Sequence, residues 1–445
     1  MLIFIENTPR AYAWGSTDAL PQMLGTAPTG EPQAELWLGT HPGSPAQVAK
    51  ATPVQHTLID LVQSDPERYG VNGGPLPFLL KVLAIGAPLS LQVHPNQAQA
   101  AAGYAAEEAA GVPRDAAHRN YGDPTHKPEL LVALGKVSAL SGFRDLATAR
   151  EDLLLLAAAA REVGRAAGAA GLERAACRLV GRDPRELRRA FLTWVFSDEA
   201  SITDALECLP AVLGAAEHGD IDFWERALAE GTVDADRLTA LRALAAAHPG
   251  DPGVLVSVLL HLVHLEPGEA IYLGAGQLHA YLGGIAVEVM ASSDNVLRAG
   301  LTSKHVDIDE LCRIVDTGEL ADPRFPALRV RAGVLAWRPE VPEFQLVRVR
   351  VREEGVDASG DPTALDAAPV VELPVLCPVV LIVTAGKVRI ERPEAVLTEV
   401  ATARRGQSLY ISAGEPVRIT GNGEVFLASV GAEVTDRLEQ QRADV

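Results

Sequence analysis

The segment EPGEAIYLGAGQLH, residues 266–279, indicates the fold of this chain, because RRGQSLYISAGEPV at residues 404–417 aligns with it without gaps. Two glycines and a tyrosine coincide in the alignment: Gly268 falls on Gly406, Tyr272 on Tyr410 and Gly276 on Gly414. A shared strand–turn–strand unit explains this repeat, and two jelly rolls of similar build would supply such a pair. Because His279 falls on Val417 in the second copy, we expect that a metal bound by only one copy is bound by the first.

The regions on both sides of the first copy differ in composition. Residues 1–143 are rich in Pro, Gly and short apolar runs, and Phe78–Leu83 and Leu89–Val93 are typical of strands. Within this region the Ala- and Glu-rich stretch Ala98–Ala110 predicts a short helix. Strand character resumes at His261–Glu266 and continues to about residue 300. The 445-residue length predicts two or three domains, not one.

Between these regions the chain is dominated by Ala, Leu, Arg and Glu at helical spacing, from residue 145 to about residue 247. DLATAREDLLLLAAAAREVGRAA, residues 145–167, predicts one helix. DPRELRRAFLTWVF, residues 183–196, predicts another, with Asp183 as its cap and Pro184 at the first helical position. A second β-rich region covers residues 326–435, where PVVLIVTAGKVRIE predicts a hairpin that turns at Ala385-Gly386.

The charge and the cysteines limit the possible partners and the compartment. The formal net charge is −19, from 39 basic and 58 acidic residues, so we expect no nucleic-acid partner and no anionic membrane surface. Four cysteines without CxxC spacing suit a reducing cytoplasm. The N-terminus has no signal-peptide pattern, and the apolar run Val254–Leu265 is too short to span a bilayer. We therefore expect a cytoplasmic protein.

Four polar residues near predicted strands form a candidate metal site. Gln92 and His94 are two apart on a predicted strand, so both side chains leave the same face. Glu129 follows Pro128 at the entrance of an apolar strand, and His279 follows the glycine-rich turn. Two imidazoles, a carboxylate and an amide suit zinc with room for water or substrate, and no cysteine is present to close the site. The alternatives are a structural histidine after the turn and a solvent-facing strand edge.

The spacing of Gly268–His279 resembles the second motif of the cupin superfamily, with Gly274 where that motif usually has Pro. We expect a mainly β chain with an α insertion: two cupin-type jelly-roll β-domains plus an all-helical domain. The expected boundaries are 1–144 and 250–325 for a discontinuous catalytic cupin domain, 145–249 for the helical insertion and 326–445 for a C-terminal jelly roll without a metal site.

The first 320 residues also resemble one enzyme family, type I phosphomannose isomerase. The stretches that carry the resemblance are YAWGS (12–16), AELWLGTHP (34–42), LPFLLKVLAIGAPLSLQVHPN (76–96), HKPELLVALG (126–135), LSGFR (140–144), EPGEAIYLGAGQLHAYL (266–282) and VEVMASSDNVLRAGLTSKHVD (287–307). The resemblance implies one Zn²⁺ per chain, held by Gln92, His94, Glu129 and His279, and an essential arginine at Arg298. It further implies a monomer that converts a sugar phosphate, mannose 6-phosphate, into fructose 6-phosphate through an enediol(ate).

Such an isomerisation needs a base and a local cluster of positive charge. Glu288 alternates with Ala286 and Met290 on one predicted strand face, and we take it as the first candidate for the base. The alternative reading makes Val287 and Val289 the core side of that strand. Lys127 is the second candidate for the base, with Lys81 and His126 as rivals.

The remaining candidate residues contact the substrate. We expect the phosphate near Arg298, Lys304, Lys81 and the hydroxyl of Ser90. Tyr281 shares a strand face with His279 and is expected to line the pocket, and Asp294 matches a family motif. Two other functions remain open at this point: an iron or manganese oxygenase of the cupin type, and a non-enzymatic sugar-binding or regulatory protein with this fold.

Overall fold

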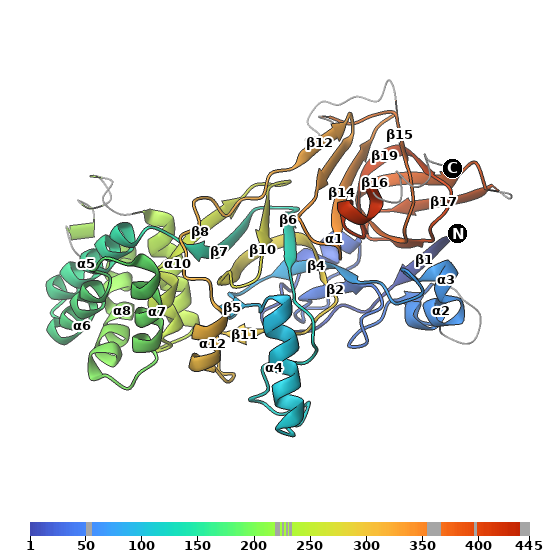
Figure 1. Cartoon of the computed structure of the whole chain (residues 1–445). Coiled ribbons are helices and arrows are strands. Elements are labelled where there is room, and N and C mark those ends of the chain that lie inside the picture. The colour runs from blue at the N-terminus through green and yellow to red at the C-terminus, as the bar shows by residue number, and fades with distance from the viewer. Residues whose placement is uncertain are drawn as a thin grey trace.

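The computed structural model describes residues 1–49, 56–218, 223–224, 227, 230, 234–353, 366–395 and 398–436. Helices gather at one end of the molecule, one antiparallel sheet lies in the middle, and a second antiparallel sheet occupies the other end (Figure 1). The expected combination of large β regions with a helical insertion is therefore confirmed.

The middle sheet is organised around one long strand, β10 (His279–Ala291). Residues 284–291 of β10 pair with β4 and residues 286–290 with β6, whereas its first residues pair with β7 and, at His279, with β5. The register shifts between Tyr281 and Gly283, where the strand changes partners. The other strands of this sheet are β2 (Glu35–Leu38), β4 (Phe78–Ile85), β5 (Gln92–Val93), β6 (Glu129–Ala133), β7 (Val137–Phe143), β8 (Leu260–Leu265), β9 (Ala270–Leu273) and β11 (Leu297–Arg298).

The second sheet is built mainly from the last part of the chain. Its strands from that part are β12 (Leu328–Arg331), β13 (Val334–Trp337), β14 (Gln345–Val351), β15 (Val370–Leu373), β16 (Val379–Arg392), β17 (Glu399–Arg404), β18 (Ser408–Ile411) and β19 (Val417–Ser429). Two strands from the beginning of the chain extend it: β1 (Leu2–Glu6) pairs with β18, and β3 (Gln47–Val48) pairs with β1. No pattern in the sequence predicted that the N-terminal strand joins this sheet.

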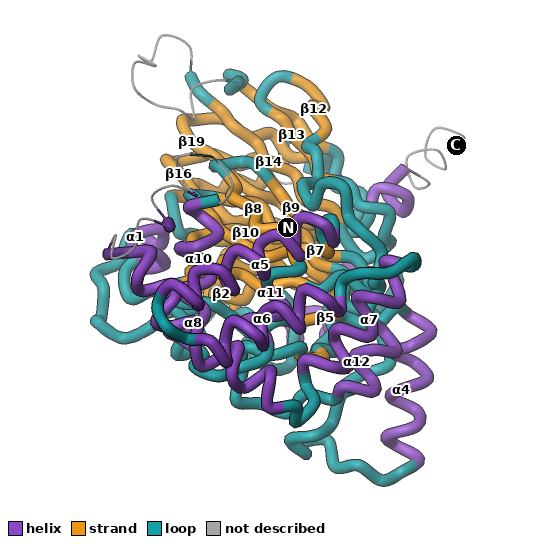
Figure 2. The backbone as a smooth tube through the Cα atoms, turned by 90° about the vertical axis from the view of Figure 1, so that its left-hand side faces the viewer, coloured by secondary structure: helices purple, strands orange, loops and turns teal. Residues whose placement is uncertain are grey.

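Five of the described helices form a layered group that covers one end of the middle sheet (Figures 1 and 2). This group contains α5 (Leu146–Glu162), α6 (Ala166–Arg178), α7 (Pro184–Val195), α8 (Ala200–His218) and α10 (Ala235–Ala247). The remaining helices are α1 (Ala19–Leu24), α2 (Leu58–Ser64), α3 (Pro66–Tyr69), α4 (Gln97–Ala109), α11 (Gly253–Ser257) and α12 (Ile308–Ile314). As the sequence predicted, the Asp183 side chain caps α7 at the N–H groups of Arg185 and Glu186, with Pro184 opening the helix.

Two sequence predictions about single elements are wrong. The helix expected over 145–167 is two helices, because the chain turns at Gly164 with φ 71° and α6 starts anew at Ala166. The hairpin expected at Ala385-Gly386 is one continuous strand, β16. A bulge at Thr384 and a positive φ of 69° at Gly386 bend this strand without reversing it.

The predicted repeat is confirmed in three dimensions. The first copy forms β9, a turn and the start of β10, and the second copy forms β18, a turn and the start of β19. The aligned glycines have positive φ in both copies: 92° and 85° at Gly268 and Gly406, and 78° and 131° at Gly276 and Gly414. Both copies thus have a positive φ at the same two glycines, and the second sheet has a buried valine where the first has His279.

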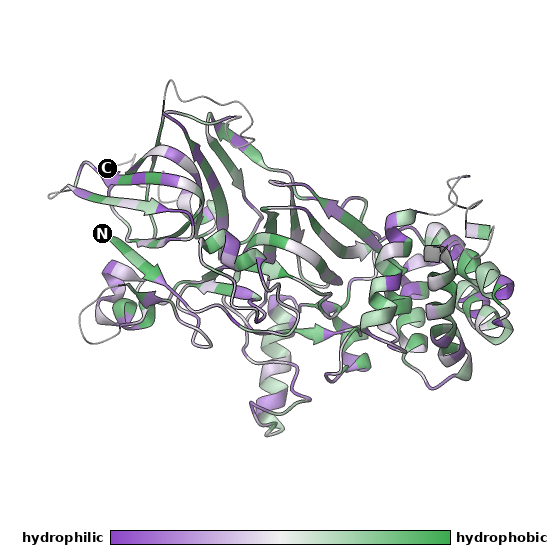
Figure 3. Ribbon diagram, turned by 180° about the vertical axis from the view of Figure 1, so that it is seen from behind, coloured by the Kyte–Doolittle hydropathy of each residue, from purple (hydrophilic) through white to green (hydrophobic). Residues whose placement is uncertain are grey.

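One hydrophobic core joins the two sheets. It contains side chains of the middle sheet, such as Val82 and Val287, together with side chains of the second sheet, such as Trp337, Tyr410 and Phe426. The helices show both apolar and polar residues (Figure 3), as expected for helices that bury one side. No helix in the described part of the chain has the length and apolar character needed to cross a membrane.

Candidate active site and metal centre

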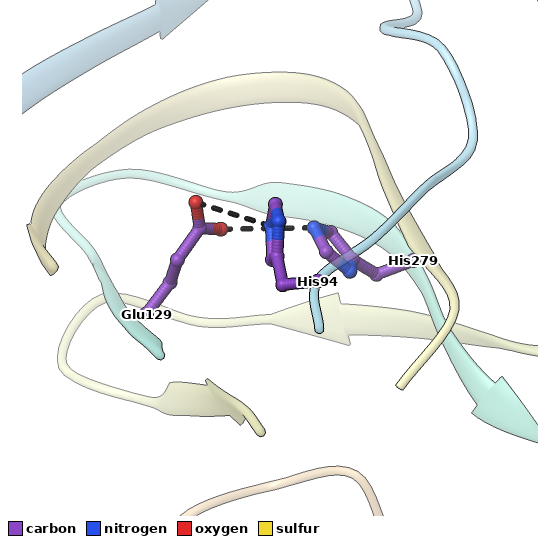
Figure 4. Close-up of side chains that lie close together, drawn as sticks. All are labelled: His94, Glu129 and His279. Carbon is purple, nitrogen blue, oxygen red and sulfur yellow. Dashed lines mark ion pairs between the residues drawn. The ribbon is translucent and has the colours of Figure 1, made fainter. Parts of the chain in front are cut away.

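Three of the four residues predicted as metal ligands lie together inside the middle sheet: His94, Glu129 and His279 (Figure 4). The Nε2 atom of His94 is 3.4 Å from Oε1 of Glu129, and Nε2 of His279 is 3.6 Å from Oε2 of the same carboxylate. All three side chains are buried. One carboxylate therefore faces two imidazoles in a space closed to solvent.

Backbone carbonyls fix the tautomers of both histidines. Nδ1 of His94 lies 2.8 Å from the carbonyl oxygen of Asn295, and Nδ1 of His279 lies 2.9 Å from that of Gln277. A carbonyl only accepts hydrogen bonds, so each Nδ1 carries the proton and each Nε2 offers a lone pair toward Glu129. Nε2 of His94 is buried and has no hydrogen-bond partner among the described residues. An unpaired buried nitrogen of this kind fits a metal ligand.

The charges of this group also fit a cation. Burial lowers the pKa of His94, and burial lowers the pKa of His279 to about 4, so both imidazoles are neutral. Although burial opposes it, the Lys127 ammonium holds the pKa of Glu129 well below its usual value. Two neutral imidazoles and one carboxylate form the mixed N/O set that suits zinc.

Gln92, the fourth predicted ligand, lies on β5, two residues before His94 in the sequence. It is directly opposite His279 in one strand pair and opposite Arg298 in the other. Directly opposed residues of an antiparallel pair share a face, so Arg298, Gln92 and His279 form one row across three strands. The row leads from the buried histidine to a partly buried arginine.

A second buried carboxylate, Glu288, lies on β10 beyond the metal-ligand group. The hydroxyl of Tyr281 donates a hydrogen bond of 3.0 Å to Oε1 of Glu288, and Nζ of Lys81 is 3.6 Å from Oε2. Val287 and Val289 pack in the core between the two sheets, so Glu288 points to the opposite, site-facing side. Both faces of this strand are therefore buried: the two valines face the core, as in the alternative reading, and Glu288 lies on the other buried face rather than on a solvent-exposed one.

Protonation differs sharply between the groups around Glu288. Burial, assisted by the Glu129 carboxylate, raises the pKa of Glu288 to about 7 in spite of the nearby lysine. Burial also raises the pKa of Tyr281 well above its usual value, so its phenol stays protonated and donates. Lys81 behaves in the opposite way: against the effect of burial, the carboxylates of Glu35 and Glu288 raise its pKa. A permanently charged Lys81 is a poor base, whereas Glu288 exchanges a proton near neutral pH.

A polar cavity of about 410 Å³ opens above these buried groups. It is lined by both aromatic and charged side chains, among them Tyr12, Glu35, Trp37, His41, Lys81, Gln92, Arg114, Lys127, Asp294 and Arg298. Its volume lies in the range of small-molecule sites. The cavity connects to the groups below it through contacts: Lys127 donates to Glu129, Lys81 pairs with Glu288, and Gln92 pairs with His279.

Only some of the residues predicted to bind the phosphate line the cavity. Arg298 lines the cavity and Lys304 does not, although the positive charge of Arg298 lowers the pKa of Lys304. No ion pair to either side chain is present among the described residues. Lys81 also lines the cavity but is neutralised by Glu35 and Glu288, at 3.7 and 3.6 Å. Ser90 is half-buried on the segment before β5 and does not line the cavity.

The structure also brings to the cavity a side chain to which the sequence analysis assigned no role, that of His41. His41 lines the cavity, its Nδ1 accepts from the Gly43 N–H at 3.1 Å, and its Nε2 lies 3.3 Å from Oδ1 of Asp294. Hydrogen bonding from His41 lowers the pKa of Asp294, which keeps that carboxylate charged at the cavity wall. His126, a rival for the base, does not line this cavity and pairs instead with Glu343 at 2.9 Å.

Comparisons with known proteins agree with this site. The family model "Phosphomannose isomerase type I, catalytic domain" matches residues 2–146. The mannose-6-phosphate isomerase of Escherichia coli K12 is 38% identical over 311 residues, which cover 68% of this chain and 72% of that protein. The mannose-6-phosphate isomerase of Emericella nidulans is 32% identical over 398 residues, covering 81% and 83%. A crystal structure of zinc-bound mannose 6-phosphate isomerase superposes with a TM-score of 0.78 at 29% identity, covering 97% and 99% of the two chains.

Proposed function

The chain belongs to the type I phosphomannose isomerase family, and from this premise we infer that it interconverts mannose 6-phosphate and fructose 6-phosphate as a zinc enzyme. The observation that carries this inference is the buried group of His94, Glu129 and His279, which lies beneath a polar cavity of about 410 Å³. Relatives from bacteria and fungi carry the same activity in their names, so the oxygenase and the inactive sugar-binding protein are not proposed.

We propose that Gln92, His94, Glu129 and His279 hold the zinc ion. The lone pairs of the two Nε2 atoms, the ionised carboxylate and the position of Gln92 opposite His279 support this set. When bound, zinc supplies positive charge that polarises the oxygen atoms of the substrate.

The proposed base is Glu288. In the open-chain aldehyde, its carboxylate removes the proton from C2, and the electron pair forms the C1=C2 bond of the enediolate while negative charge develops on O1. The same carboxyl group then returns the proton to C1. Lys127, which lines the cavity, gives a proton to O1 and takes one from O2, so that the aldehyde becomes a hydroxyl and the O2 hydroxyl becomes the ketone. The pKa of Glu288 near 7 supports its role, because it exchanges protons readily at neutral pH.

Polar and charged groups in and near the cavity are proposed to bind the rest of the substrate and to orient the base. Arg298 and Lys304 have no anionic partner among the described residues, which supports a phosphate site there. Lys81, between Glu35 and Glu288, and Tyr281, which donates to Glu288, orient the base. Asp294, held by His41, is proposed to accept from a sugar hydroxyl.

We also propose the finer architecture. Residues 1–144 and 250–325 form a cupin-type jelly roll that carries the site, 145–249 an all-helical insertion, and 326–445 a second jelly roll without metal. The equivalent turns of the two repeat copies and the apolar residue at position 417 support this division, while β1 and β3 pair with the second sheet. The protein is further proposed to be a cytoplasmic monomer, with four free cysteines in agreement with a reducing compartment.

The experiment that tests the function is a coupled assay of fructose 6-phosphate formation from mannose 6-phosphate. His279→Ala should lose activity by two orders of magnitude or more, on the order of what removal of a catalytic-site metal ligand costs. His264→Ala is the matched control, because His264 is half exposed on β8 of the same sheet. Absence of isomerase activity in the zinc-loaded wild-type protein would reject the proposal.

A further inference from the structure

Asn295 is a fully buried asparagine behind the proposed metal site, and its side chain closes a loop. Its Oδ1 accepts from the N–H groups of Gly122 and Asp123, at 2.8 and 3.3 Å. Its Nδ2 donates to the carbonyl oxygens of Asp123 and Thr125, at 2.7 and 2.8 Å. An asparagine amide has two donors and one acceptor oxygen, so these four bonds use the whole group.

The carboxylate of Asp123 ties the same loop to the neighbours of Asn295. It accepts from the hydroxyl of Ser293 at 3.0 Å and from the N–H of Asp294 at 2.9 Å. It also accepts from the N–H of Thr125 at 3.0 Å. The segment 122–125 and the segment 293–295 are therefore held together by reciprocal side-chain bonds. We call this set, Asp123, Ser293 and Asn295, the clamp.

The clamp is connected to two proposed zinc ligands, to His94 by a hydrogen bond and to Glu129 along the chain. The backbone carbonyl of Asn295 accepts from Nδ1 of His94, which directs Nε2 toward Glu129. The loop that the Asn295 side chain closes continues directly into Lys127 and Glu129. One residue thus bonds to the ring of one ligand and to the loop that leads into the strand of another.

We propose that Asn295, acting through the clamp, is a positioning residue that brings His94 and Glu129 to the spacing a metal ion needs. This inference rests on the proposed zinc function and deepens it. Partners that orient metal ligands commonly change metal affinity by about 10- to 100-fold when they are replaced.

The test is the zinc dissociation constant of purified protein, measured by competition with a chelating dye, beside the melting temperature of the zinc-free protein. Asn295→Asp keeps the shape but removes both donors and sets a negative charge against two carbonyl oxygens and the Asp123 carboxylate. We expect its zinc dissociation constant to rise by about tenfold or more. The control is Asn96→Asp, which adds the same charge close to His94 but at an exposed helix cap, where Asn and Asp serve equally.

The inference is overturned if Asn295→Asp binds zinc as tightly as the wild type, even if its melting temperature falls, because that pattern describes a purely structural residue. If this variant does not fold, Ser293→Ala serves instead: it removes one donor to Asp123 and leaves Asn295 in place. A several-fold weaker zinc affinity then supports the clamp, and an unchanged affinity contradicts it. Failure of the wild-type protein to bind zinc would reject the proposed function itself, and the two failures are thus distinguishable.

Discussion

The hydroxyl of Tyr281 donates a 3.0 Å hydrogen bond to Glu288, and both side chains are buried on the same strand, β10. The two residues lie on opposite sides of the register shift at which β10 changes its pairing partners. The shift lets one strand carry His279 and Tyr281 in one part and Glu288 in the other, within reach of each other. A carboxylate with a raised pKa is thereby held beside the metal-ligand group.

Replacement of Glu288 by glutamine should remove the base with little change of shape. We expect kcat to fall by about 100-fold or more, the range in which general bases contribute. Glu266→Gln, at an exposed carboxylate directly after β8, is the control and should keep its activity. Near-normal turnover of Glu288→Gln with wild-type zinc content would exclude Glu288 and leave Lys127 as the candidate.

The activity should depend on pH through the same carboxylate. A base acts in its ionised form, so protonation as the pH falls through the pKa of Glu288 removes activity. Burial raises this pKa to about 7. The positive charge of zinc opposes that rise, so kcat/KM should decline below about pH 7 or somewhat lower and stay level above it. A profile in which kcat/KM increases as the pH is lowered from 7 to 5 would contradict an ionised carboxylate base.

We expect Lys304 to support the activity toward mannose 6-phosphate and not the activity toward mannose. Lys304→Ala removes a cation that lies near Arg298 without an anionic partner among the described residues. We expect kcat/KM for mannose 6-phosphate to fall by on the order of 10-fold or more, as for loss of a charge-assisted hydrogen bond, with little change for mannose. Lys136→Ala, at a solvent-exposed pair with Glu266, is the control. Equal effects on both sugars would remove Lys304 from the phosphate site.

We expect replacement of Asp152 to lower the stability of the fold and not to act on the catalytic reaction. Its carboxylate accepts from the buried Arg144 and lies 3.6 Å from Arg237, which is also buried, at the junction of the helices and the middle sheet. Asp152→Asn leaves two buried cations without their counter-charge and should cost about 3 kcal/mol or more of unfolding free energy. Glu173→Gln, which breaks the exposed pair with Arg161, should cost less than about 1 kcal/mol. Denaturant titration checks both values, and equal losses would contradict the difference assigned to burial.

The parts of the fold that local chemistry determines were predictable from the sequence. The cap at Asp183 and the glycine turns of the repeat follow from short-range rules, and both are observed. The helix break at Gly164 was missed because apolar spacing continues through it. The bulge in β16 was read as a turn, because an Ala-Gly pair between two apolar runs has the same local pattern in either case.

Contacts between residues far apart in the sequence were harder to predict from the sequence. The pairing of β1 with β18 joins residues about 400 positions apart in the sequence, and no local pattern predicts it. His94, Glu129 and His279 were predicted from their residue types at the ends of expected strands and turns, and the motifs of a family mark the same positions. Asn295 and His41 act through hydrogen bonds to distant segments, and only the folded chain brings those partners together.

The most direct measurement of the central claim is the coupled isomerase assay before and after removal of metal, with zinc content measured alongside. Chelation should abolish the conversion of mannose 6-phosphate, and one equivalent of zinc per chain should restore it, because the neutral imidazoles and the ionised Glu129 are arranged for a cation. Full activity in protein shown to be free of metal would contradict the account.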